Sequence, residues 1–278
     1  MTRTAAAPSR RLTMPFVTSF QARFDRAVAE QFAARPLGPA VPLTEADLAA
    51  MPAPVRRYVV RSGAVGRPRP RNARVAFDAL MWSKPGAKPM RAASVQYNFF
   101  DRPARLFTMK ARMYGLPVRA LHLYREESAT FQVRVASLVN VVDLAGDGIS
   151  RAETVTVLND MCFFAPGGLA DPRVAWETVD DRTAVAHFTN GPHRVSATLL
   201  FNDADELVDF WSDDRPEGGA GVLRPMRWST PIDDYRDVDG RHLARHGLAV
   251  YAYPEGPFTY GDFTIRSIEY DVAGPAPG

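Results

Sequence analysis

Apolar residues follow a helical spacing in the first part of the chain and an alternating spacing after residue 71. In the first part an apolar side chain recurs at every fourth position, at Phe16, Phe20, Phe24, Val28 and Phe32. This spacing predicts one amphipathic helix, which should end before Arg35-Pro36 because a residue preceding proline avoids helical geometry. A second, shorter helix is expected between Pro54 and Gly63, since proline favours the first turn of a helix and glycine the position just past its end.

After residue 71 apolar and polar residues alternate with a period of two, which predicts strands separated by short turns. The segments expected to form strands are 75–82, 92–100, 104–113, 118–124, 130–135, 174–179, 183–189, 193–201, 207–211, 241–253 and 258–270. Strands spaced in this way are typical of an antiparallel meander that curls into a barrel or half-barrel.

One segment interrupts the alternation and predicts a central helix. Ser150 and Glu153 have the spacing of a capping box, in which serine begins the helix, and the sequence 165–168 (Ala-Pro-Gly-Gly) ends it. The expected fold is therefore a β-rich α+β structure: a large antiparallel meander with a central capping helix and N-terminal helices. We expect an N-terminal extension with one amphipathic helix at 1–44, a single barrel-like domain at 45–272 and a flexible tail at 273–278.

The chain has 278 residues, one cysteine and 46% hydrophobic residues, which together exclude a disordered chain and a disulfide scaffold. Its charge is unevenly distributed, because residues 1–124 contain 21 of the 34 Lys and Arg but six of the 31 Asp and Glu. One interpretation is a nucleic-acid surface on the cluster Arg56, Arg57, Arg61, Arg67, Arg69, Arg71 and Arg74. We favour the other, in which arginines of the first half pair with carboxylates of the second, because the strand pattern continues through residue 124.

Three arginines precede a mildly apolar stretch at 12–20, but polar residues interrupt that stretch and no signal peptide is expected. No window is apolar for long enough to predict a transmembrane helix. Because Cys162 has no possible partner within the chain, a cytoplasmic location is expected.

Histidine, glycine and cysteine patterns predict neither a metal site nor a cofactor. His242 and His246 lie in a segment expected to be a strand, where residues four apart are about 13 Å from each other. His187 and His193 flank a turn, but two imidazoles alone make a weak metal site. The chain contains no glycine-rich phosphate loop, and Cys162 lies in an apolar segment, which favours a buried, inert thiol.

Several short motifs together resemble a known family. The chain contains Met51-Pro52-Ala53-Pro54-Val55-Arg56-Arg57-Tyr58 and then Ser62-Gly63-Ala64-Val65-Gly66, with Phe164-Ala165-Pro166, Trp176, Tyr235 to Gly240 and Phe258-Thr259-Tyr260 further on. These motifs resemble a bacterial domain family catalogued only as a domain of unknown function, over roughly residues 48–272. The resemblance implies no established activity, so it assigns no catalytic residue.

The central helix carries the strongest candidate for chemistry. Asp160 lies within an otherwise apolar run, and burial would raise its pKa towards the range useful for acid–base catalysis. Asn159 is its neighbour, and His187 and Tyr97 are candidate hydrogen-bonding partners. The alternative, which we weight at least equally, is that Asp160 forms a structural ion pair with an arginine of the first half such as Arg112.

A curved sheet would enclose an apolar cavity beside this helix. The residues expected to line the cavity are Trp82, Phe99, Met109, Met113, Tyr114, Tyr124, Trp228 and Arg112. We expect an apolar small molecule as the partner and favour a cofactor-independent isomerase, lyase or cyclase. The alternative is a non-catalytic carrier of a lipid-like or hydrophobic molecule. Neither nucleic acid nor a membrane-spanning segment is expected, and the oligomeric state is left open.

Overall fold

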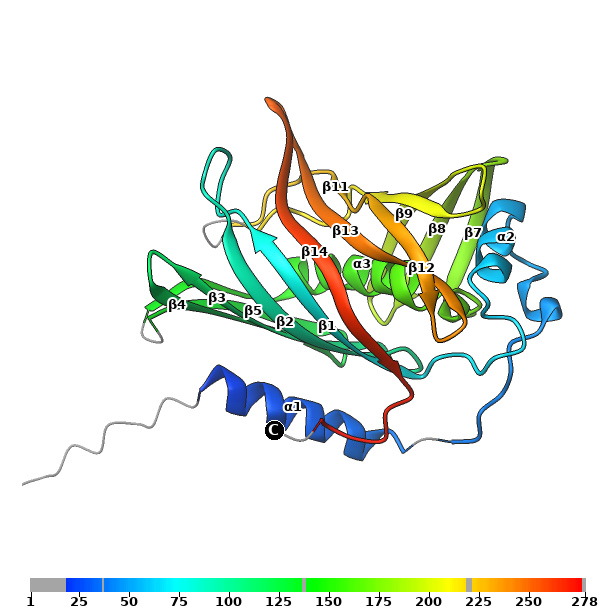
Figure 1. Cartoon of the computed structure of the whole chain (residues 1–278), viewed down its shortest axis with the longest axis horizontal. Helices are drawn as coiled ribbons and strands as arrows, with labels where there is room; N and C mark the ends of the chain where they lie inside the picture. Colours follow the sequence, from blue (N-terminus) through cyan, green and yellow to red (C-terminus); the bar gives the residue numbers. More distant parts are fainter. Residues whose placement is uncertain (1–18, 37, 137–138, 219–221, 277–278) are drawn as a thin grey trace, which may run out of the picture.

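A computed structural model describes residues 19–36, 38–136, 139–218 and 222–276. In it, one antiparallel sheet of 14 strands curls around a long central helix, α3 (Figure 1). The predicted half-barrel with a central helix and N-terminal helices is confirmed. The first half of the chain supplies strands β1 to β6 and the second half supplies β7 to β14, and the two halves meet where β1 pairs with β14.

The strands follow one another in the order β6-β5-β4-β3-β2-β1-β14-β13-β11-β10-β9-β8-β7, and β12 pairs with β13 outside this path. Their bounds are β1 Asn72–Met81, β2 Met90–Phe99, β3 Ala104–Met113, β4 Leu116–Arg125, β5 Ser128–Val135, β6 Val139–Ala145, β7 Val174–Asp180, β8 Thr183–Asn190, β9 His193–Phe201, β10 Leu207–Ser212, β11 Trp228–Ser229, β12 Ile232–Val238, β13 Arg241–Tyr253 and β14 Gly256–Tyr270.

The alternating pattern predicted most of these strands and missed three. The bounds of β3, β9 and β13 agree with the prediction residue for residue. The missed strands are β6, β11 and β12. Strand β6 lies at one edge of the sheet, and of its residues only Leu144 is buried while Val139 and Val141 are exposed, so its apolar residues do not alternate clearly. Strand β12 carries exposed acidic residues and pairs with one neighbour.

Helix α3 (Asp147–Phe164) connects the two edge strands β6 and β7 and lies within the curve of the sheet (Figure 1). The predicted capping box is wrong, because the helix begins at Asp147, after Gly146 with φ 98°. Ser150 lies one turn inside, where its hydroxyl donates to the Gly146 carbonyl and accepts from the Ala129 amide. Glu153 is therefore free of any capping role and points into the protein interior, where it is buried.

Helix α1 (Phe20–Ala34) covers the convex face of the same sheet, on the opposite side from α3 (Figure 1). Its helical spacing is confirmed, and its first predicted residue, Phe16, lies outside the described residues. Phe20, Phe24 and Val28 pack against a separate apolar cluster on β2, β3 and β4 that includes Tyr97, Phe99, Leu106, Leu121 and Leu123. This half of the sheet thus buries side chains on both of its faces.

The remaining helices lie near the C-terminal end of α3. Helix α2 (Ala53–Arg61), predicted from its proline and glycine, is joined to α3 by a hydrogen bond of 2.6 Å from the Tyr58 hydroxyl to the Cys162 carbonyl. Two short 3-10 helices, η1 (Glu45–Leu48) and η2 (Pro166–Leu169), complete the described structure.

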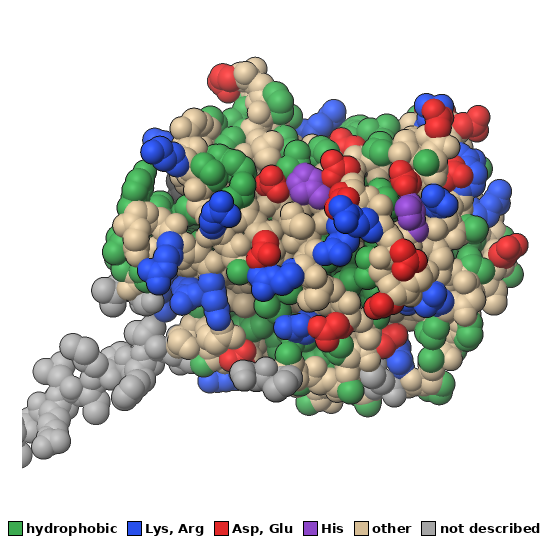
Figure 2. Space-filling view, in the orientation of Figure 1, with side chains coloured by type: hydrophobic (Ala, Val, Ile, Leu, Met, Phe, Trp, Pro, Cys, Tyr) green, Lys and Arg blue, Asp and Glu red, His purple; other side chains and the backbone are tan. Residues whose placement is uncertain are grey.

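Arginines of the first half pair with carboxylates of the second, as expected from the uneven charge distribution. Arg74 and Glu269 are cross-strand partners on β1 and β14, 2.6 Å apart, whereas Asp78 and Arg266 on the same two strands form an ion pair with the charges reversed. Of the N-terminal arginine cluster, Arg57 and Arg71 also form ion pairs with second-half carboxylates. Figure 2 shows acidic side chains among the basic ones on this face.

Candidate functional site

A cavity of about 550 Å³ lies between α3 and the concave face of the sheet. This volume falls within the roughly 300–1,000 Å³ typical of small-molecule sites. Most of its lining is apolar, with contributions from both halves of the sheet, including Met81, Met90, Phe107, Val133, Phe131, Leu144, Phe163, Tyr260 and Phe263. The cavity therefore offers a mainly hydrophobic surface, with a group of polar side chains at one place in its wall.

The register of the strands explains how the lining is built. Phe107, His122 and Phe131 are successive cross-strand partners on β3, β4 and β5, and all three line the cavity. The His122 and Phe131 rings lie 4.7 Å apart. Because side chains alternate between faces along each strand, every second residue of these strands contributes to the same wall.

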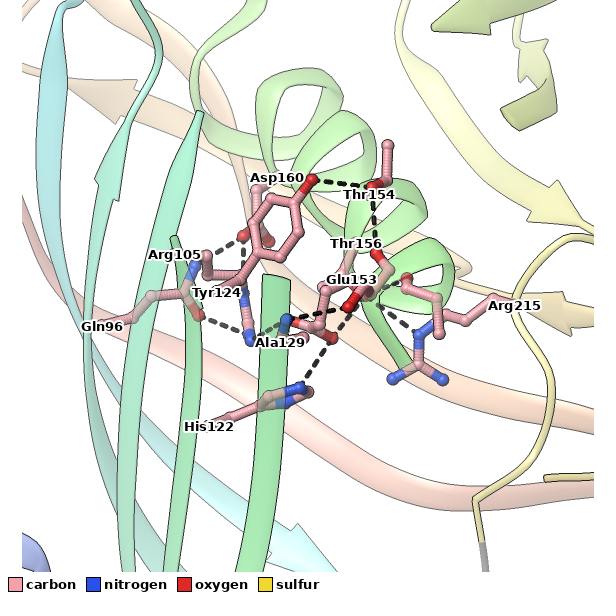
Figure 3. A network of polar contacts seen from close by, with 12 residues as sticks. Gln96, Arg105, His122, Tyr124, Ala129, Glu153, Thr154, Thr156, Asp160 and Arg215 are labelled. Carbon is pink, nitrogen blue, oxygen red and sulfur yellow. Dashed lines mark hydrogen bonds and ion pairs between the residues drawn. The ribbon is translucent and has the colours of Figure 1, made fainter. Parts of the chain in front are cut away.

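Asp160 of α3 is the centre of the polar group (Figure 3). Its Oδ2 atom accepts hydrogen bonds from Gln96 Nε2 at 2.7 Å, Asn98 Nδ2 at 2.8 Å and Arg105 Nε at 2.9 Å. The alternative prediction of a structural ion pair is thus realised, with Arg105 in place of Arg112. Gln96 and Asn98 come from β2 and Arg105 from β3, so these contacts fasten the helix to the sheet.

Glu153, nearly two turns earlier on α3, extends the network. One carboxylate oxygen lies 3.1 Å from Arg105 Nη1 and the other lies 3.4 Å from His122 Nε2. Thr156 also donates to this carboxylate, at 3.1 Å. Arg105 therefore contacts two buried carboxylates at once, which is the arrangement that compensates the cost of burying charge.

Burial shifts the pKa values of these groups in opposite senses. Burial raises the pKa of Asp160 to about 6, against the opposing effect of Arg105. It lowers the pKa of His122 to about 4, so that imidazole is neutral at pH 7. Although burial also opposes the charge of Glu153, the surrounding His122, Arg105 and Arg215 keep the pKa of this carboxyl below its ordinary value.

Arg215, in the segment after β10, also lines the cavity and lies beside Thr156 and Glu153 (Figure 3). Its Nε donates to the Thr156 hydroxyl at 3.0 Å and its Nη1 to the Tyr251 hydroxyl at 2.6 Å. The guanidinium stacks on the Trp228 ring, 4.2 Å from its centroid. The Thr156 hydroxyl that Arg215 contacts also donates to Glu153, and the positive charge of Arg215 helps to lower the pKa of that carboxyl. Arg215 is thus fixed by Thr156, Tyr251 and Trp228, with the Glu153 carboxylate nearby.

The structure brings six of the predicted site residues to the cavity. Asp160, Asn159, Trp82, Met109, Met113 and Trp228 all line it. Asn159 donates to the Thr230 hydroxyl at 2.5 Å rather than to Asp160. The two α3 residues and the aromatic and methionine side chains therefore share one site, as the sequence predicted.

Tyr97 and Phe99 lie elsewhere, on the convex face of β2. They pack under α1, where the Phe32 ring contacts both of them, and so neither reaches the cavity. The residues between and beside them, Gln96 and Asn98, face the concave side instead. The prediction assigned the aromatic positions of β2 to the wrong face because it did not foresee that a helix covers the convex side.

The other predicted residues also lie outside the cavity. Tyr124 is fully buried beneath α3, with its hydroxyl bonded to Thr154 and Asn190. Tyr114 is 93% exposed in the β3–β4 turn, and Arg112 donates to the Gly115 carbonyl of that turn. His187 lies on the outer side of β8 and contacts Ser196 and Glu177, because its neighbours Ala186 and Phe188 occupy the buried side.

Sequence analysis missed the polar residues Gln96, Arg105, His122, Glu153 and Arg215. A signal for Arg105 was present, because it shares the period-two face of β3 with Met109 and Met113, which were predicted to line the cavity. Arg215 offered no such signal, since it lies outside any strand.

The other reactive side chains considered above have structural partners. Burial raises the pKa of the Cys162 thiol, in keeping with an inert cysteine. His242 and His246 lie on strand β13, as predicted. His242 contacts Glu206, and His246 contacts Asp233 and Asp262. Among the described residues, none of the helices combines the length and apolar character needed to cross a membrane.

Comparisons with known proteins add a family and two distant structural likenesses. The model of the family of unknown function DUF6544 matches residues 41–263, which confirms the resemblance carried by the short motifs. No curated protein matches the chain. A putative outer membrane lipoprotein-sorting protein domain from Vibrio parahaemolyticus has a TM-score of 0.41 and 6% identity, over 72% of this chain and 85% of that chain. A LolA superfamily protein from Nitrosomonas europaea has a TM-score of 0.38 and 10% identity, over 87% of this chain and 93% of that chain. At these values neither likeness bears on what the chain binds.

Proposed function

Since this chain belongs to the family of unknown function DUF6544, we propose its function from its own geometry: it binds a lipid-like, mostly apolar small molecule in the cavity and carries it unchanged. The observation that carries the proposal is the cavity of about 550 Å³ with a predominantly apolar lining. Burial of an apolar ligand against such a wall is favourable in proportion to the area removed from water.

The polar group in the wall supports binding more than catalysis. Three donors converge on one oxygen of Asp160, and Arg105 also contacts Glu153. Such contacts hold α3 against the sheet, which is a structural role for the Oδ2 atom of this carboxylate. This is the carrier alternative of the sequence analysis, and it replaces the enzyme as the favoured interpretation.

Arg215 supplies the polar contact for the ligand. It lines the cavity and is fixed by Thr156, Tyr251 and Trp228. A hydroxyl, carbonyl or carboxylate at one end of an otherwise apolar molecule would satisfy its remaining hydrogen-bonding capacity. The cytoplasmic location expected from the sequence stays a prediction.

Native mass spectrometry tests the proposal. The purified protein is examined for co-purifying molecules and then titrated with palmitate. We expect a one-to-one complex with the wild type, and its loss in Val133→Phe, which fills the cavity from β5. The matched control is Val185→Phe, on β8 and outside the lining, which should bind as the wild type does. Absence of any apolar ligand on the wild type would contradict the proposal.

One observation favours a second candidate function. Asp160 lines the cavity, and burial raises its pKa to about 6, a value suited to general acid–base catalysis. A cofactor-independent isomerase, lyase or cyclase would use this carboxyl on the bound molecule. The test is to incubate identified ligands with wild type, Asp160→Asn and Asp209→Asn. Burial raises the pKa of Asp209 to about 6 as well, but Asp209 is not part of the lining. Turnover lost only in Asp160→Asn would establish catalysis, and unchanged ligand in all three would exclude it.

A further inference from the structure

Exposed apolar side chains gather at the end of the sheet where β3 turns into β4 and β6 begins. Tyr114, in the β3–β4 turn, is 93% exposed and Leu116, the first residue of β4, is 50% exposed, while Val139 is 60% and Val141 50% exposed at the start of β6. These side chains form an apolar rim. Such large exposed apolar side chains are unusual when they lie together on a soluble surface.

The strand register places the rim beside residues that line the cavity. Met113 pairs with Leu116 across the β3–β4 turn, and Val135 pairs with both Val118 of β4 and Val139 of β6. Met113, Val118 and Val135 themselves line the cavity, as does Val141. The apolar lining of the cavity therefore continues outward onto the exposed rim.

A row of cations crosses the convex face beside this rim. Lys110, Arg119 and Arg134 are successive cross-strand partners on β3, β4 and β5. Like charges in directly opposite positions destabilise a sheet. Among the described residues, none of the three forms an ion pair, whereas Arg74 and Arg266 on β1 and β14 each face a carboxylate. Arg134 donates to Asn140 and packs on the Phe20 ring, but neither contact neutralises its charge, so the row stays positively charged.

Further basic residues lie at the same end. The β1–β2 loop carries Lys84 and Lys88, and its flanking residues Met81 and Met90 pair with each other and line the cavity. Figure 2 shows Lys and Arg side chains at this end of the molecule, on the left of the view. Apolar rim and positive charge therefore lie at the same end of the sheet.

We infer that this end of the molecule docks on a bilayer surface that contains anionic lipids. Apolar side chains that enter the interface, flanked by Lys and Arg at the level of the headgroups, are the pattern of peripheral membrane binding. Nucleic acid would use the cations but not the aliphatic rim. Docking in this way turns the lining residues next to the rim towards the bilayer. The inference goes beyond the proposed function, because it rests on the surface and not on the identity of the ligand.

Vesicle co-sedimentation tests the inference with the full chain. We expect binding to vesicles of phosphatidylcholine mixed with phosphatidylglycerol, and weak binding to phosphatidylcholine alone. Lys110→Gln/Arg119→Gln should weaken partitioning by about 30-fold, since each basic residue near an anionic surface contributes on the order of fivefold. Tyr114→Ser/Leu116→Ser should weaken it by about tenfold or more, through loss of buried apolar area. Added salt should weaken the wild type more than the charge variant.

Two controls on distant parts of the surface are matched to these changes. Val179→Ser removes a side chain that is 54% exposed on β7, at the other edge of the sheet, and Arg56→Gln removes an exposed cation from α2. Both should bind vesicles as the wild type does. The inference is overturned if the wild type does not bind anionic vesicles, if the rim and charge variants bind as tightly as the controls, or if the chain binds duplex DNA in preference to vesicles.

Discussion

The two faces of strands β2 to β4 differ in what covers them, and this difference decides where the site lies. On the convex face, Tyr97, Phe99 and Leu106 are packed under α1. On the concave face of the same strands, Gln96, Arg105 and His122 meet α3 and the cavity. The aromatic face is thus the structural one, and the more polar face carries the site. Apolar character alone therefore does not identify a ligand-binding wall when both faces of a sheet are covered.

The largest expected effect comes from breaking the polar attachment of α3 on the concave face. Arg105→Met should lower the free energy of unfolding by about 3–5 kcal/mol, because it leaves Asp160 and Glu153 buried without their shared cation. Chemical denaturation measures this. Arg74→Met is the control, since it breaks an ion pair at the surface with Glu269 and should cost less than about 1 kcal/mol. Equal losses in the two variants would show that the network does not secure the helix.

Truncation on the convex face should separate stability from binding. Phe99→Ala removes a ring that is 2% exposed beneath α1 and should cost about 3 kcal/mol through the cavity it leaves. Palmitate affinity at a temperature where the variant is folded should be that of the wild type. A loss of affinity as large as that of Val133→Phe would show that the convex face takes part in binding.

The pH dependence of stability should sharpen the role of Asp160. Burial raises its folded pKa to about 6 from an ordinary value of 3.8, so the folded state binds the proton more tightly than the unfolded state does. The stability that this group contributes is thus greatest below pH 4 and falls as the pH rises to about 6. The wild type should therefore lose about 2 kcal/mol relative to Asp160→Asn over this interval, which is measured by urea denaturation at each pH. A constant difference between the two proteins from pH 4 to pH 7 would contradict the shift.

The smallest expected effect on stability is on the apolar part of the concave face. Met109 lines the cavity but is 7% exposed and packs in an apolar cluster of the sheet, so Met109→Ala should cost about 2 kcal/mol, at the low end for a buried methionine. The same change should weaken palmitate binding, which is the reverse of the outcome expected for Phe99→Ala. If Met109→Ala destabilises the protein as much as Phe99→Ala does, the cavity is filled by packing and is not a binding site.

Much of the fold could be predicted from the sequence, because local patterns carry it. The period of two located β3, β9 and β13 to the residue, and the four-residue spacing located α1. Alternation shows that a strand has two different faces but does not show which one is inside. On β2 both faces are buried, with Gln96 at 1% and Tyr97 at 3% exposure. Only the docking of α1, which is a long-range contact, decides between them.

The candidate site was predictable where it depends on one element and not where it depends on several. Asp160 stood out because a carboxylate within an apolar helical run requires a partner. The identity of that partner depends on which strands lie under α3. The partner is therefore Arg105 and not the predicted Arg112. Arg215 belongs to an irregular segment whose position follows from the folded sheet and has no local signature.

Quenching of tryptophan fluorescence by dibrominated stearate tests the central claim most directly, because bromine quenches an indole only at close range. Of the four tryptophans in the chain, Trp82 and Trp228 line the cavity and Trp176 and Trp211 do not. We expect saturable quenching of the wild type that persists in Trp176→Phe/Trp211→Phe and disappears in Trp82→Phe/Trp228→Phe. Absence of saturable quenching in the wild type, or its persistence in Trp82→Phe/Trp228→Phe, would contradict a lipid-binding cavity between α3 and the sheet.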